Sequence, residues 1–475
     1  MIKKDAILIG SGQANVPFAK KLSEAGWKIV MIEKSVEKLG GVCLNVGCTP
    51  TKTLIASAKV MHDIKVAGKH GISVSDLDIN FKKTQQRKDA IVEEGKKGMI
   101  KRMGEVKNLE IVYGKGSFKD KNTVIVKMEN GKEKEFSAPY IFIDAGARPA
   151  IPKIKNLDKI KYYDSTGILE LKEIPKKLIV VGGGYIGLEL GQMYSRFGSK
   201  VTILDNSSTI MSHEDEDVTK PLQEILEKEG MNFILNSFVE KVSENGKNVS
   251  VTYKIKGKEH SITGSHLLVV TGRISNADTL NTKAAGIKLD EKGFIKVNSK
   301  LETNVKNIFA MGDINGGPQF THISYNDFVI MTENILHKGK RTTKGRIVPY
   351  TMFTDPQVGR VGLSENQAKK QKLDYSVIKI AGERITRGKE TAQTQGPWKA
   401  VIDNKSGQIL GASIVCTEGG EIATVLQMAM LGKIPADYFP TGIFAHPTYS
   451  ESLNTLFSQI YTLNKNKNFL KKTFK

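Results

Sequence analysis

The sequence predicts an α/β protein with two Rossmann-like dinucleotide-binding domains, followed by an α+β domain. Near the N-terminus, a short apolar strand runs into a glycine-rich loop and then a helix. The same order of elements returns near residue 177. Beyond residue 343, short strands alternate with polar segments and one long apolar helix. A chain of 475 residues is long enough for several domains of ordinary size, so the three regions are expected to fold as separate units.

The first predicted unit ends at Glu33. An apolar strand leads into Gly10 and Gly12, a helix is expected over residues 16–25, and a second strand over residues 28–33 ends in Glu33. Glycines at these positions allow the backbone to approach a pyrophosphate, which rests on the helix N-terminus. An acid at the end of the second strand accepts hydrogen bonds from a ribose. The pattern is typical of a dinucleotide site.

The second predicted unit repeats this pattern. A strand over residues 177–181 leads into Gly182, Gly184 and Gly187, and a strand over residues 200–205 ends in Asp205. In both units the acid follows the second glycine by the same interval, since 33 − 12 = 21 and 205 − 184 = 21. One G-x-G-x-x-G motif is weak evidence, but two copies with matching strands and acids predict two separate dinucleotide sites.

The two copies differ at one position, because Asn15 stands where the first motif should have its third glycine. That glycine normally allows close packing of helix on strand. We therefore expect a local adjustment around Asn15 that leaves the two glycines nearest the phosphates in place.

The remaining elements are predicted from short apolar runs. Between and after the two units, strands are expected at residues 111–113, 123–127, 140–144, 233–242, 248–255 and 266–270. In the last region, strands are expected at residues 350–354, 376–380 and 398–403, and a helix at residues 419–431. This last group predicts an α+β domain with its own core.

Composition excludes several classes of protein. The formal net charge is +21, but the lysines are spread along the chain, and the densest stretches, residues 96–102 and 465–475, lack interleaved aromatic residues. A solvated basic surface is expected rather than a nucleic-acid site. No apolar run is long enough for a membrane span or a signal peptide. Three cysteines are too few for a disulfide-rich secreted protein, so a cytoplasmic location is expected.

Two of the cysteines, Cys43 and Cys48, directly follow the first unit. In a regular helix, five residues rise about 7.5 Å and turn about 140° from eclipsed, whereas a disulfide needs Cα atoms about 4.4–6.8 Å apart. Gly47 and Pro50 would permit a distorted turn here. A metal site is disfavoured because no second cysteine pair or nearby histidine completes a ligand set, and no metal is expected. The alternative to a disulfide is that Cys43 and Cys48 are two buried thiols with a structural role.

The segment GGVCLNVGCTPTK at residues 40–52 closely resembles the redox motif of the class I pyridine nucleotide–disulfide oxidoreductases. This family includes dihydrolipoamide dehydrogenase, glutathione reductase and mercuric reductase. Further segments that resemble the family's motifs lie at residues 141–149, 271–276, 308–313 and 446–451. Ser275 departs from the family pattern, which usually has proline there. The resemblance covers nearly the whole chain.

The resemblance implies a defined electron path. NAD(P)H would reduce FAD, and the flavin would then open a Cys43–Cys48 disulfide. Cys48 would be the charge-transfer thiolate beside the flavin, and Cys43 the interchange thiol that attacks the substrate. Lys52 and Glu189 match the positions of the family's ion pair near the flavin ring.

The resemblance also implies a homodimer with an active site shared between subunits. His446, oriented by Glu451, would act as the acid–base group in the site of the other subunit. The implied domains are 1–150 for FAD, 151–270 for NAD(P), 271–342 for the returning FAD segment and 343–475 for dimerisation. The residues assigned to cofactor binding are Gly10, Gly12, Glu33, Lys52, Gly116, Ala145, Gly146, Gly182, Gly184, Gly187, Asp205, Gly272, Asp313, Gln319 and His322.

The nicotinamide cofactor is predicted to be NADH. Asp205 favours a ribose 2′-hydroxyl over a 2′-phosphate, and residues 206–211 contain no lysine or arginine. NADPH remains the alternative, and neither a nucleic acid nor a membrane is an expected partner.

The terminal acceptor is predicted to be a small disulfide or a thiol-reactive compound. Residues 49–58, 316–324 and 353–361 resemble the mercuric-reductase-like branch. However, residues 464–475 contain no cysteine, and an N-terminal C-x-x-C domain is missing, unlike true mercuric reductases. The alternatives are mercuric-ion reductase, dihydrolipoamide dehydrogenase of a 2-oxoacid dehydrogenase complex, and a non-enzymatic scaffold that binds RNA or an acidic protein.

Overall fold

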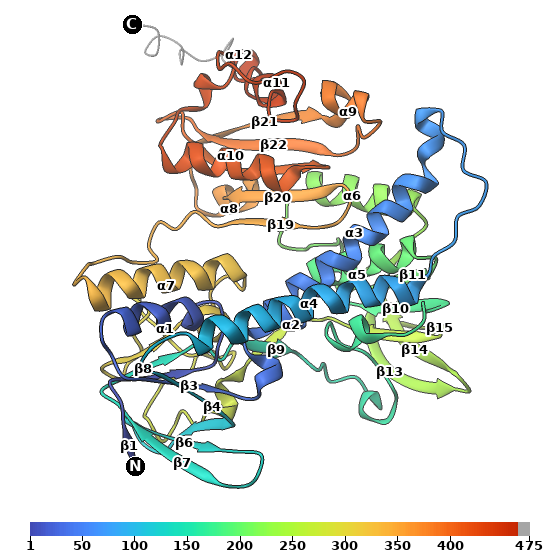
Figure 1. Ribbon diagram of the computed structural model, residues 1–475. Coiled ribbons are helices and arrows are strands. Elements are labelled where there is room, and N and C mark those ends of the chain that lie inside the picture. The colour runs from blue at the N-terminus through green and yellow to red at the C-terminus, as the bar shows by residue number, and fades with distance from the viewer. Residues whose placement is uncertain (464–475) are drawn as a thin grey trace, which may run out of the picture.

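A five-stranded parallel sheet forms the centre of the N-terminal region in the computed structural model, which describes residues 1–463 (Figure 1). Its strand order is β18-β8-β2-β3-β4. The strands are β2 (Ala6–Ile9), β3 (Ile29–Glu33), β4 (Leu109–Tyr113), β8 (Tyr140–Ile143) and β18 (Ile308–Ala310). The inner strands are apolar and almost fully buried, as expected for a parallel sheet covered on both faces. The expected βαβ unit is present, with helix α1 at Asn15–Glu24.

Helices cover one face of this sheet, and a smaller sheet lies near the other (Figure 1). Helix α1 packs against α7 (Thr321–Leu336), and Phe18 of α1 contacts Phe142 of β8 edge to face at 4.8 Å between ring centroids. The smaller sheet has the order β1-β7-β6-β5. Its strands are β1 (Ile2–Lys3), β5 (Lys115–Phe118), β6 (Thr123–Lys127) and β7 (Glu133–Ser137).

The second glycine motif lies in a separate parallel sheet of order β12-β11-β10-β16. Its elements are β10 (Lys177–Val181), α5 (Tyr185–Arg196), β11 (Lys200–Leu204), α6 (Glu216–Lys228), β12 (Asn232–Ile234) and β16 (His266–Val269). An antiparallel sheet of β13 (Phe238–Asn245), β14 (Asn248–Ile255) and β15 (Lys258–Gly264) is inserted before β16. The prediction of a single strand at residues 233–242 was wrong, because this stretch contains the end of β12 and the start of β13. The chain turns at residues 235–237, where Asn236 has a φ of 52° and Ser237 Oγ donates to Ile234 O at 2.7 Å.

Two short strands join the cofactor-binding regions. Strand β9 (Ala147–Pro149) pairs antiparallel with β17 (Arg273–Ser275), so the outgoing and returning connections lie side by side. Ser275, where the family usually has proline, accepts a hydrogen bond from Ala277 N at 3.2 Å. The hydroxyl therefore caps the next turn, a task that proline cannot perform.

The C-terminal domain is a five-stranded antiparallel sheet with helices around it (Figure 1). Its order is β19-β20-β23-β22-β21, formed by β19 (Pro349–Met352), β20 (Gln357–Gly362), β21 (Tyr375–Ala381), β22 (Pro397–Asp403) and β23 (Ile409–Cys416). The helices are α8 (Glu365–Lys370), α9 (Thr386–Glu390), α10 (Gly419–Leu431), α11 (Ser452–Phe457) and α12 (Ile460–Leu463). Trp398 is fully buried at the centre of a core that belongs to this domain.

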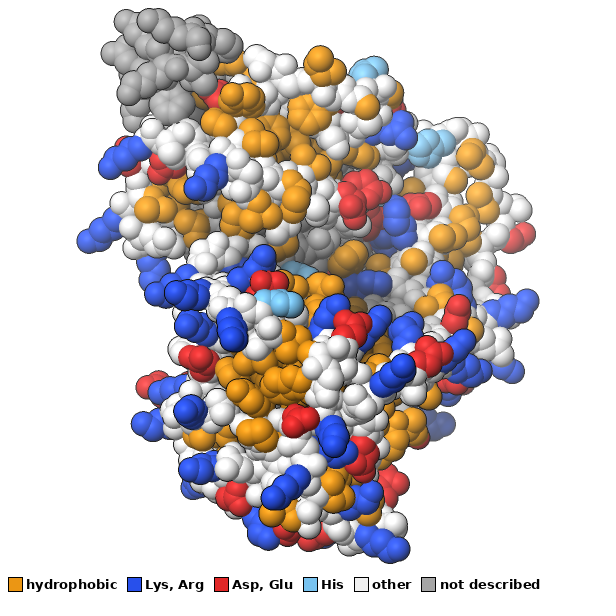
Figure 2. All heavy atoms as spheres, turned by 60° about the vertical axis from the view of Figure 1, so that its left-hand side comes forward, with side chains coloured by type: hydrophobic (Ala, Val, Ile, Leu, Met, Phe, Trp, Pro, Cys, Tyr) orange, Lys and Arg blue, Asp and Glu red, His pale blue; other side chains and the backbone are white. Residues whose placement is uncertain are grey.

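Two long helices cross the molecule between these regions. Helix α3 (Cys48–Lys65) follows the short helix α2 (Gly41–Asn45) and packs against both α4 (Phe81–Gly104) and α5. No helix within residues 1–463 combines the length and the apolar character needed to cross a membrane. On the face shown in Figure 2, lysines and arginines are scattered among acidic side chains. The expected basic stretch at residues 465–475 lies outside the described residues.

Candidate active site

Cys43 and Cys48 lie on either side of a break between two helices. Cys43 is in α2, and Cys48 is the first residue of α3. Gly40 and Gly41, with φ values of 91° and 75°, lead the chain into α2. A Cβ atom on Gly47 would lie 2.9 Å from Val42 O, so the turn between the cysteines requires glycine there. Both cysteines are thiols in this structure.

The two thiols have opposite acidities. The pKa of Cys48 is lowered to about 6, first by hydrogen bonding with Cys43, then by Thr321 and the positive charge of Lys52. The pKa of Cys43 is raised, because Cys48 and burial both favour its protonated form. Thr321 Oγ1, at the start of α7, lies 3.4 Å from Cys48 Sγ. At neutral pH the pair therefore holds a Cys48 thiolate beside a protonated Cys43.

Lys52 and Glu189 form the predicted ion pair. Lys52 lies in α3, four residues after Cys48. Its Nζ atom is 2.5 Å from Glu189 Oε2. Glu189, buried in α5, also accepts a hydrogen bond from Phe353 N at 2.7 Å. The Lys52 ammonium group lies 4.8 Å from the centroid of the Phe353 ring. The pair thus connects the cysteine-bearing helix to the second sheet domain and to the C-terminal domain.

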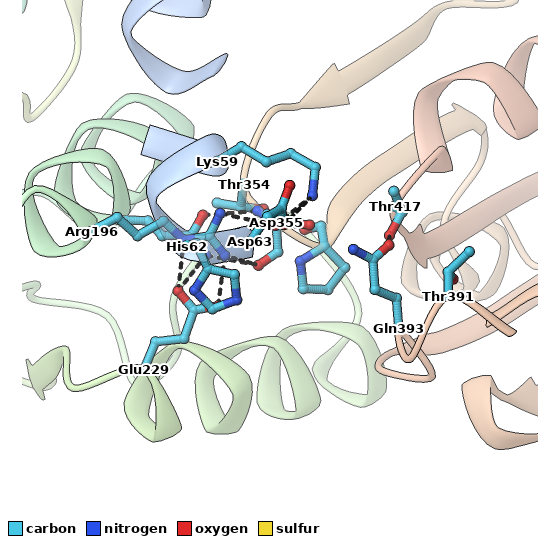
Figure 3. Close-up of polar contacts among 12 residues, drawn as sticks. Lys59, His62, Asp63, Arg196, Glu229, Thr354, Asp355, Thr391, Gln393 and Thr417 are labelled. Carbon is cyan, nitrogen blue, oxygen red and sulfur yellow. Dashed lines mark hydrogen bonds and ion pairs between the residues drawn. The ribbon is translucent and has the colours of Figure 1, made fainter. Parts of the chain in front are cut away.

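The other end of α3 is held by a network of ion pairs (Figure 3). Asp355 Oδ2 contacts Lys59 Nζ at 3.3 Å and Arg196 Nη1 at 2.9 Å. Arg196 also pairs with Glu229 at 2.8 Å, and His62 lies beside Glu229 at 3.9 Å. Burial and Arg196 lower the pKa of His62, which is consistent with a neutral ring. A cavity of about 550 Å³ lies next to this network.

The first glycine loop fits the diphosphate of a dinucleotide. Glu33 Oε2 accepts hydrogen bonds from Ser11 N at 2.9 Å and from Ser11 Oγ at 2.6 Å, which closes the loop against the end of β3. Within residues 1–463, the N–H groups of Gly12 and Gln13 have no acceptor. They lie just before α1, where the helix dipole also favours an anion.

Asn15 makes the adjustment that its position predicted. Its side chain is fully buried, and Nδ2 donates to Gly10 O at 2.9 Å. In the second loop, a Cβ atom on Gly187 would lie 1.9 Å from Gly182 O, so helix and loop are in direct backbone contact there. The amide of Asn15 replaces such a contact with a side-chain hydrogen bond in the first loop.

The second glycine loop repeats the geometry of the first. Asp205 accepts hydrogen bonds from Gly183 N at 2.6 Å and Ser207 N at 2.7 Å. In each loop the acid thus binds the N–H group of the residue after the first glycine. A Cβ atom on Gly184 would meet nothing within 4 Å, so this glycine faces open space that a diphosphate could occupy.

The remaining predicted cofactor residues gather around the first loop and the start of α7. Asp313 pairs with Arg273 at 3.1 Å, and burial raises the pKa of its carboxyl group. His322 Nε2 lies 2.7 Å from Pro349 O. Gln319 is half-buried just before α7. Ala145 O accepts a hydrogen bond from Asn276 Nδ2 at 2.7 Å. The predicted glycines with left-handed backbone are Gly10, Gly146, Gly182 and Gly272, whereas Gly116 packs close to Ile32.

His446 and Glu451 form a pair that makes no hydrogen bond or ion pair with either cysteine within residues 1–463. His446 Nδ1 is 2.9 Å from Glu451 Oε2, and this contact raises the pKa of the histidine. The His446 side chain is 69% exposed. Within residues 1–463, its only polar partner is Glu451. Within the described part of the chain, no polar contact therefore joins His446 to Cys43.

Sequence reasoning missed Thr321 and Phe353 as neighbours of the predicted site. Thr321 follows a Gly-Gly-Pro segment, which signals a turn before a helix and could have marked it as the residue at a helix start. Phe353 acts through its ring and its backbone N–H group. No local pattern identifies such a contact, because it depends on the packing of the C-terminal domain.

These features together have the architecture of a flavoprotein disulfide oxidoreductase: two glycine-loop sites, a thiol pair at a helix break and an antiparallel C-terminal domain. The family model for pyridine nucleotide-disulphide oxidoreductase matches residues 4–327, and the model for the dimerisation domain of these enzymes matches residues 348–457. The chain belongs to the class I pyridine nucleotide–disulfide oxidoreductases. It is thus an FAD-containing enzyme that uses a pyridine nucleotide and carries a dimerisation domain, as predicted.

Individual relatives cover nearly the whole chain. The probable pyridine nucleotide-disulfide oxidoreductase RclA of Escherichia coli K12 is 36% identical over 97% of this chain and 100% of its own length. A mercuric reductase of Staphylococcus aureus is 32% identical over 94% of this chain and 81% of its own length. The solved structure of HOCl-induced flavoprotein disulfide reductase RclA from E. coli matches with a TM-score of 0.87 at 35% identity, covering 96% of this chain and 100% of that one.

Proposed function

We propose that this enzyme uses NADH to reduce a small disulfide or a thiol-reactive oxidant through FAD and a Cys43–Cys48 disulfide. The observation that carries the proposal is the thiol pair at the break between α2 and α3, where Cys48 Sγ lies 3.4 Å from Thr321 Oγ1 and the Lys52–Glu189 ion pair lies one turn along α3. A pKa of about 6 keeps Cys48 ionised at neutral pH, whereas the pKa of Cys43 is raised. The two thiols thus suit the two roles of a redox pair, with Cys48 as the stable thiolate and Cys43 as the thiol that attacks the acceptor.

Cys48 has the surroundings of a stable thiolate. Thr321 lies within 3.4 Å of its sulfur, and Lys52 lowers its pKa from the next turn of α3. The Lys52–Glu189 pair holds that ammonium group in place. FAD, when bound in the first site, supplies the transfer of an electron pair from the nicotinamide to the disulfide.

Cys43 has the surroundings of a thiol that needs a base. Its raised pKa means that attack on an acceptor requires removal of its proton. His446 of the partner subunit is proposed as that base, because Glu451 orients its ring and raises its pKa. With a disulfide substrate, Cys43 sulfur bonds to one substrate sulfur, and the other leaves as a thiolate that accepts the proton from His446.

The cycle closes when the Cys48 thiolate attacks Cys43. The Cys43–Cys48 disulfide forms again, and the second substrate sulfur leaves as a thiolate that takes up a proton. Two electrons have then passed from the dithiol to the acceptor, which is reduced to two thiols. The cysteine pair is ready for another reduction.

NADH is the proposed electron donor. Asp205 ends β11 and is held by Gly183 N and Ser207 N, so its carboxylate is fixed at the mouth of the second loop. A carboxylate in this position hydrogen-bonds a ribose 2′-hydroxyl and repels a 2′-phosphate. No lysine or arginine occurs in residues 206–211 to offset that repulsion.

The names of the relatives support a thiol-reactive oxidant as acceptor. One similar protein is described as HOCl-induced and has also been solved as a Cu(II) complex, and another is a mercuric reductase. Other relatives are dihydrolipoyl dehydrogenases, such as one from Buchnera aphidicola. Hg(II), Cu(II) and lipoamide are therefore the competing acceptors to test.

A turnover panel with purified enzyme tests the proposal. Glutathione disulfide, coenzyme A disulfide, hypothiocyanous acid, lipoamide, Hg(II) and Cu(II) are each supplied with NADH or NADPH. We expect the highest kcat/KM with NADH and a small disulfide or hypothiocyanous acid, and its loss in Cys43→Ser. Highest efficiency with lipoamide would instead make the enzyme a dihydrolipoamide dehydrogenase. Activity that survives in Cys43→Ser would contradict the role of the thiol pair.

A further inference from the structure

Asp144 is a buried acid that the proposed electron path does not use. It follows β8 directly and is 5% exposed. Its Oδ2 atom accepts hydrogen bonds from Ala14 N at 2.9 Å and from Asn15 N at 3.0 Å, at the N-terminus of α1. Within residues 1–463, no lysine, arginine or histidine forms an ion pair with it. In this part of the chain, the backbone N–H groups at the positive end of α1 are the donors that contact its carboxylate.

The carboxyl group is wedged between two glycine-containing segments. A Cβ atom on Gly12 would lie 2.4 Å from Asp144 Oδ2, and one on Gly312 would lie 2.9 Å from Asp144 Oδ1. The first segment is the glycine loop, and the second begins the turn that contains Asp313. Asp144 thus lies where the two predicted parts of the FAD site meet.

The charged groups that face Asp144 are two further carboxylates, each with its own arginine. Asp313 pairs with Arg273 at 3.1 Å, and Asp327 of α7 pairs with Arg346 at 2.6 Å. The pKa of Asp144 is raised to about 8, chiefly by burial. The negative charges of Asp313 and Asp327 also raise this pKa, whereas the two backbone hydrogen bonds lower it. A change of charge at Asp144 is therefore accessible near neutral pH.

A bound diphosphate would share the end of α1 with this carboxyl group. Asp144 takes the N–H groups of Ala14 and Asn15, which leaves those of Gly12 and Gln13 for the diphosphate. Two anions at one helix end repel each other, and the interior screens their repulsion poorly. The neutral carboxyl group removes that repulsion and keeps an oxygen to accept the two backbone hydrogen bonds.

We propose that Asp144 links the retention of FAD to the uptake of a proton at its own carboxyl group. The inference rests on the proposed assignment of the first loop to FAD, but not on the acceptor. The sign follows from mutual repulsion: a nearby diphosphate favours protonated Asp144, so protonated Asp144 favours the diphosphate. FAD is then held more tightly at low pH, where Asp144 is protonated. It is released faster when the pH rises above the pKa of Asp144, because the carboxyl group then carries a charge.

The test measures release of FAD from the holoenzyme, with no nicotinamide or acceptor present. Flavin fluorescence follows the release rate between about pH 6.5 and about pH 9.5. We expect the wild-type rate to rise about tenfold across this range. In Asp144→Asn the rate should stay low and independent of pH, because the amide oxygen accepts the same N–H groups without a charge. Asp164→Asn is the matched control, since Asp164 also accepts two backbone N–H groups, from Thr166 at 2.9 Å and Gly167 at 2.7 Å.

Two outcomes would overturn the inference. One is a wild-type release rate that does not change with pH, which needs no variant to interpret. The other is an Asp144→Asn enzyme that keeps the wild-type pH dependence or releases FAD rapidly at every pH. Failure of the acceptor panel would leave this measurement untouched, because no turnover is involved. The Asp164→Asn control should reproduce the wild-type profile.

Discussion

Cys48 and Cys43 differ in acidity because the hydrogen bond between them favours the Cys48 thiolate and the protonated Cys43, and Thr321 and Lys52 stabilise the Cys48 thiolate further. We predict that anaerobic reduction with stoichiometric NADH gives long-wavelength thiolate–flavin absorbance, since Cys48 is ionised at neutral pH. The band should fade as the pH drops through about 6, because protonation at the lowered pKa of Cys48 removes the anion. An anaerobic absorbance titration from about pH 4.5 to about pH 8 measures this midpoint.

Variants of the two cysteines separate their roles in the same titration. Cys48→Ser should abolish the band, because no thiolate remains at the start of α3. Cys43→Ala has no disulfide to receive electrons, so it should show the band without NADH, and the midpoint should move upward because alanine cannot donate the hydrogen bond that is the largest cause of the lowered pKa. A band that persists in Cys48→Ser would mean that the thiolate beside the flavin has been assigned to the wrong cysteine.

At the scale of single residues, the sequence predicted those site residues whose side chains are chemically reactive or charged and lie in a recognisable motif. Cysteines, a lysine and a glutamate stand out in motifs, and the structure places Lys52 against Glu189. Thr321 could not be predicted as a partner of Cys48, because the two residues are 273 positions apart. Asp144 lay inside a recognised segment, but its burial and its two backbone hydrogen bonds depend on how α1 packs. Such contacts arise from tertiary structure rather than from local pattern.

At the scale of elements, the glycine loops give a matched pair of substitutions. Gly187→Ala puts a Cβ atom 1.9 Å from Gly182 O, so α5 must move away from the loop. Gly184→Ala places its Cβ in open space. We predict that Gly187→Ala lowers both thermal stability and NADH binding. Gly184→Ala should keep the wild-type melting temperature but raise KM for NADH at least tenfold, because the methyl group meets the diphosphate.

Differential scanning fluorimetry and steady-state kinetics, both on FAD-loaded enzyme, measure these two effects. FAD content should be unchanged in both variants, because the first loop is not altered. A Gly184→Ala enzyme with wild-type KM would show that the dinucleotide does not lie over this glycine. The comparison therefore tests the placement of the nicotinamide cofactor without relying on activity toward any acceptor.

Element prediction succeeded where local periodicity was strong. The strand at Thr123–Lys127, the strand at Asn248–Ile255 and the helix at Gly419–Leu431 have the predicted bounds. The break between β12 and β13 was missed because a turn at Asn236 interrupts a run that is otherwise typical of a strand. Helices α3 and α4 were not delimited, since their apolar positions are distributed among many lysines and their burial depends on packing against each other.

At the scale of the whole molecule, Asp355 connects the C-terminal domain to α3 and α5 (Figure 3). Despite its burial, Arg196 and Lys59 lower the pKa of its carboxyl group. We predict that Asp355→Asn lowers the free energy of unfolding by about 1–3 kcal/mol at neutral pH, because buried Arg196 loses one of two partners. The carboxylate stabilises the fold above its unfolded pKa, and this contribution is lost as the pH falls through the lowered folded pKa.

Thermal melting of holoenzyme from about pH 3 to about pH 7 measures this difference. The gap between wild type and Asp355→Asn should close at the acidic end, where the wild-type carboxyl group is protonated. Asp63→Asn is a suitable control, because Asp63 pairs with the same Lys59 at 3.1 Å but is largely exposed, and its loss should have little effect. Equal destabilisation by the two substitutions would contradict a special role for the buried pair.

The dimerisation domain presents an apolar surface on one side of α10. Val425, Met428 and Leu431 recur every three residues and are 36%, 54% and 55% exposed. Figure 2 shows hydrophobic side chains across this domain and a hollow between it and the region below. An exposed row of large apolar residues indicates an interface. Within residues 1–463, His446 makes no polar contact with either cysteine. Together with the apolar surface, this is consistent with a site completed by a second copy.

A complementation experiment decides whether His446 acts in its own subunit or in its partner. We expect Cys43→Ser and His446→Gln homodimers each to reduce the acceptor poorly, while NADH still reduces the flavin in both. A mixed dimer contains one site with both wild-type residues only if Cys43 and His446 come from different subunits. Random pairing of equal amounts should then restore roughly a quarter of wild-type turnover, since half of the dimers are mixed and half of their sites are intact.

Differently tagged subunits, expressed together and purified by two affinity steps, give the mixed dimer alone. Its expected turnover is about half that of the wild type, because one of its two sites lacks both residues. Turnover no greater than that of the parent variants would place His446 in the site of its own chain, which would require residues 446–451 to approach Cys43 within one subunit. Flavin reduction by NADH serves as the internal control, because it precedes any step that needs His446.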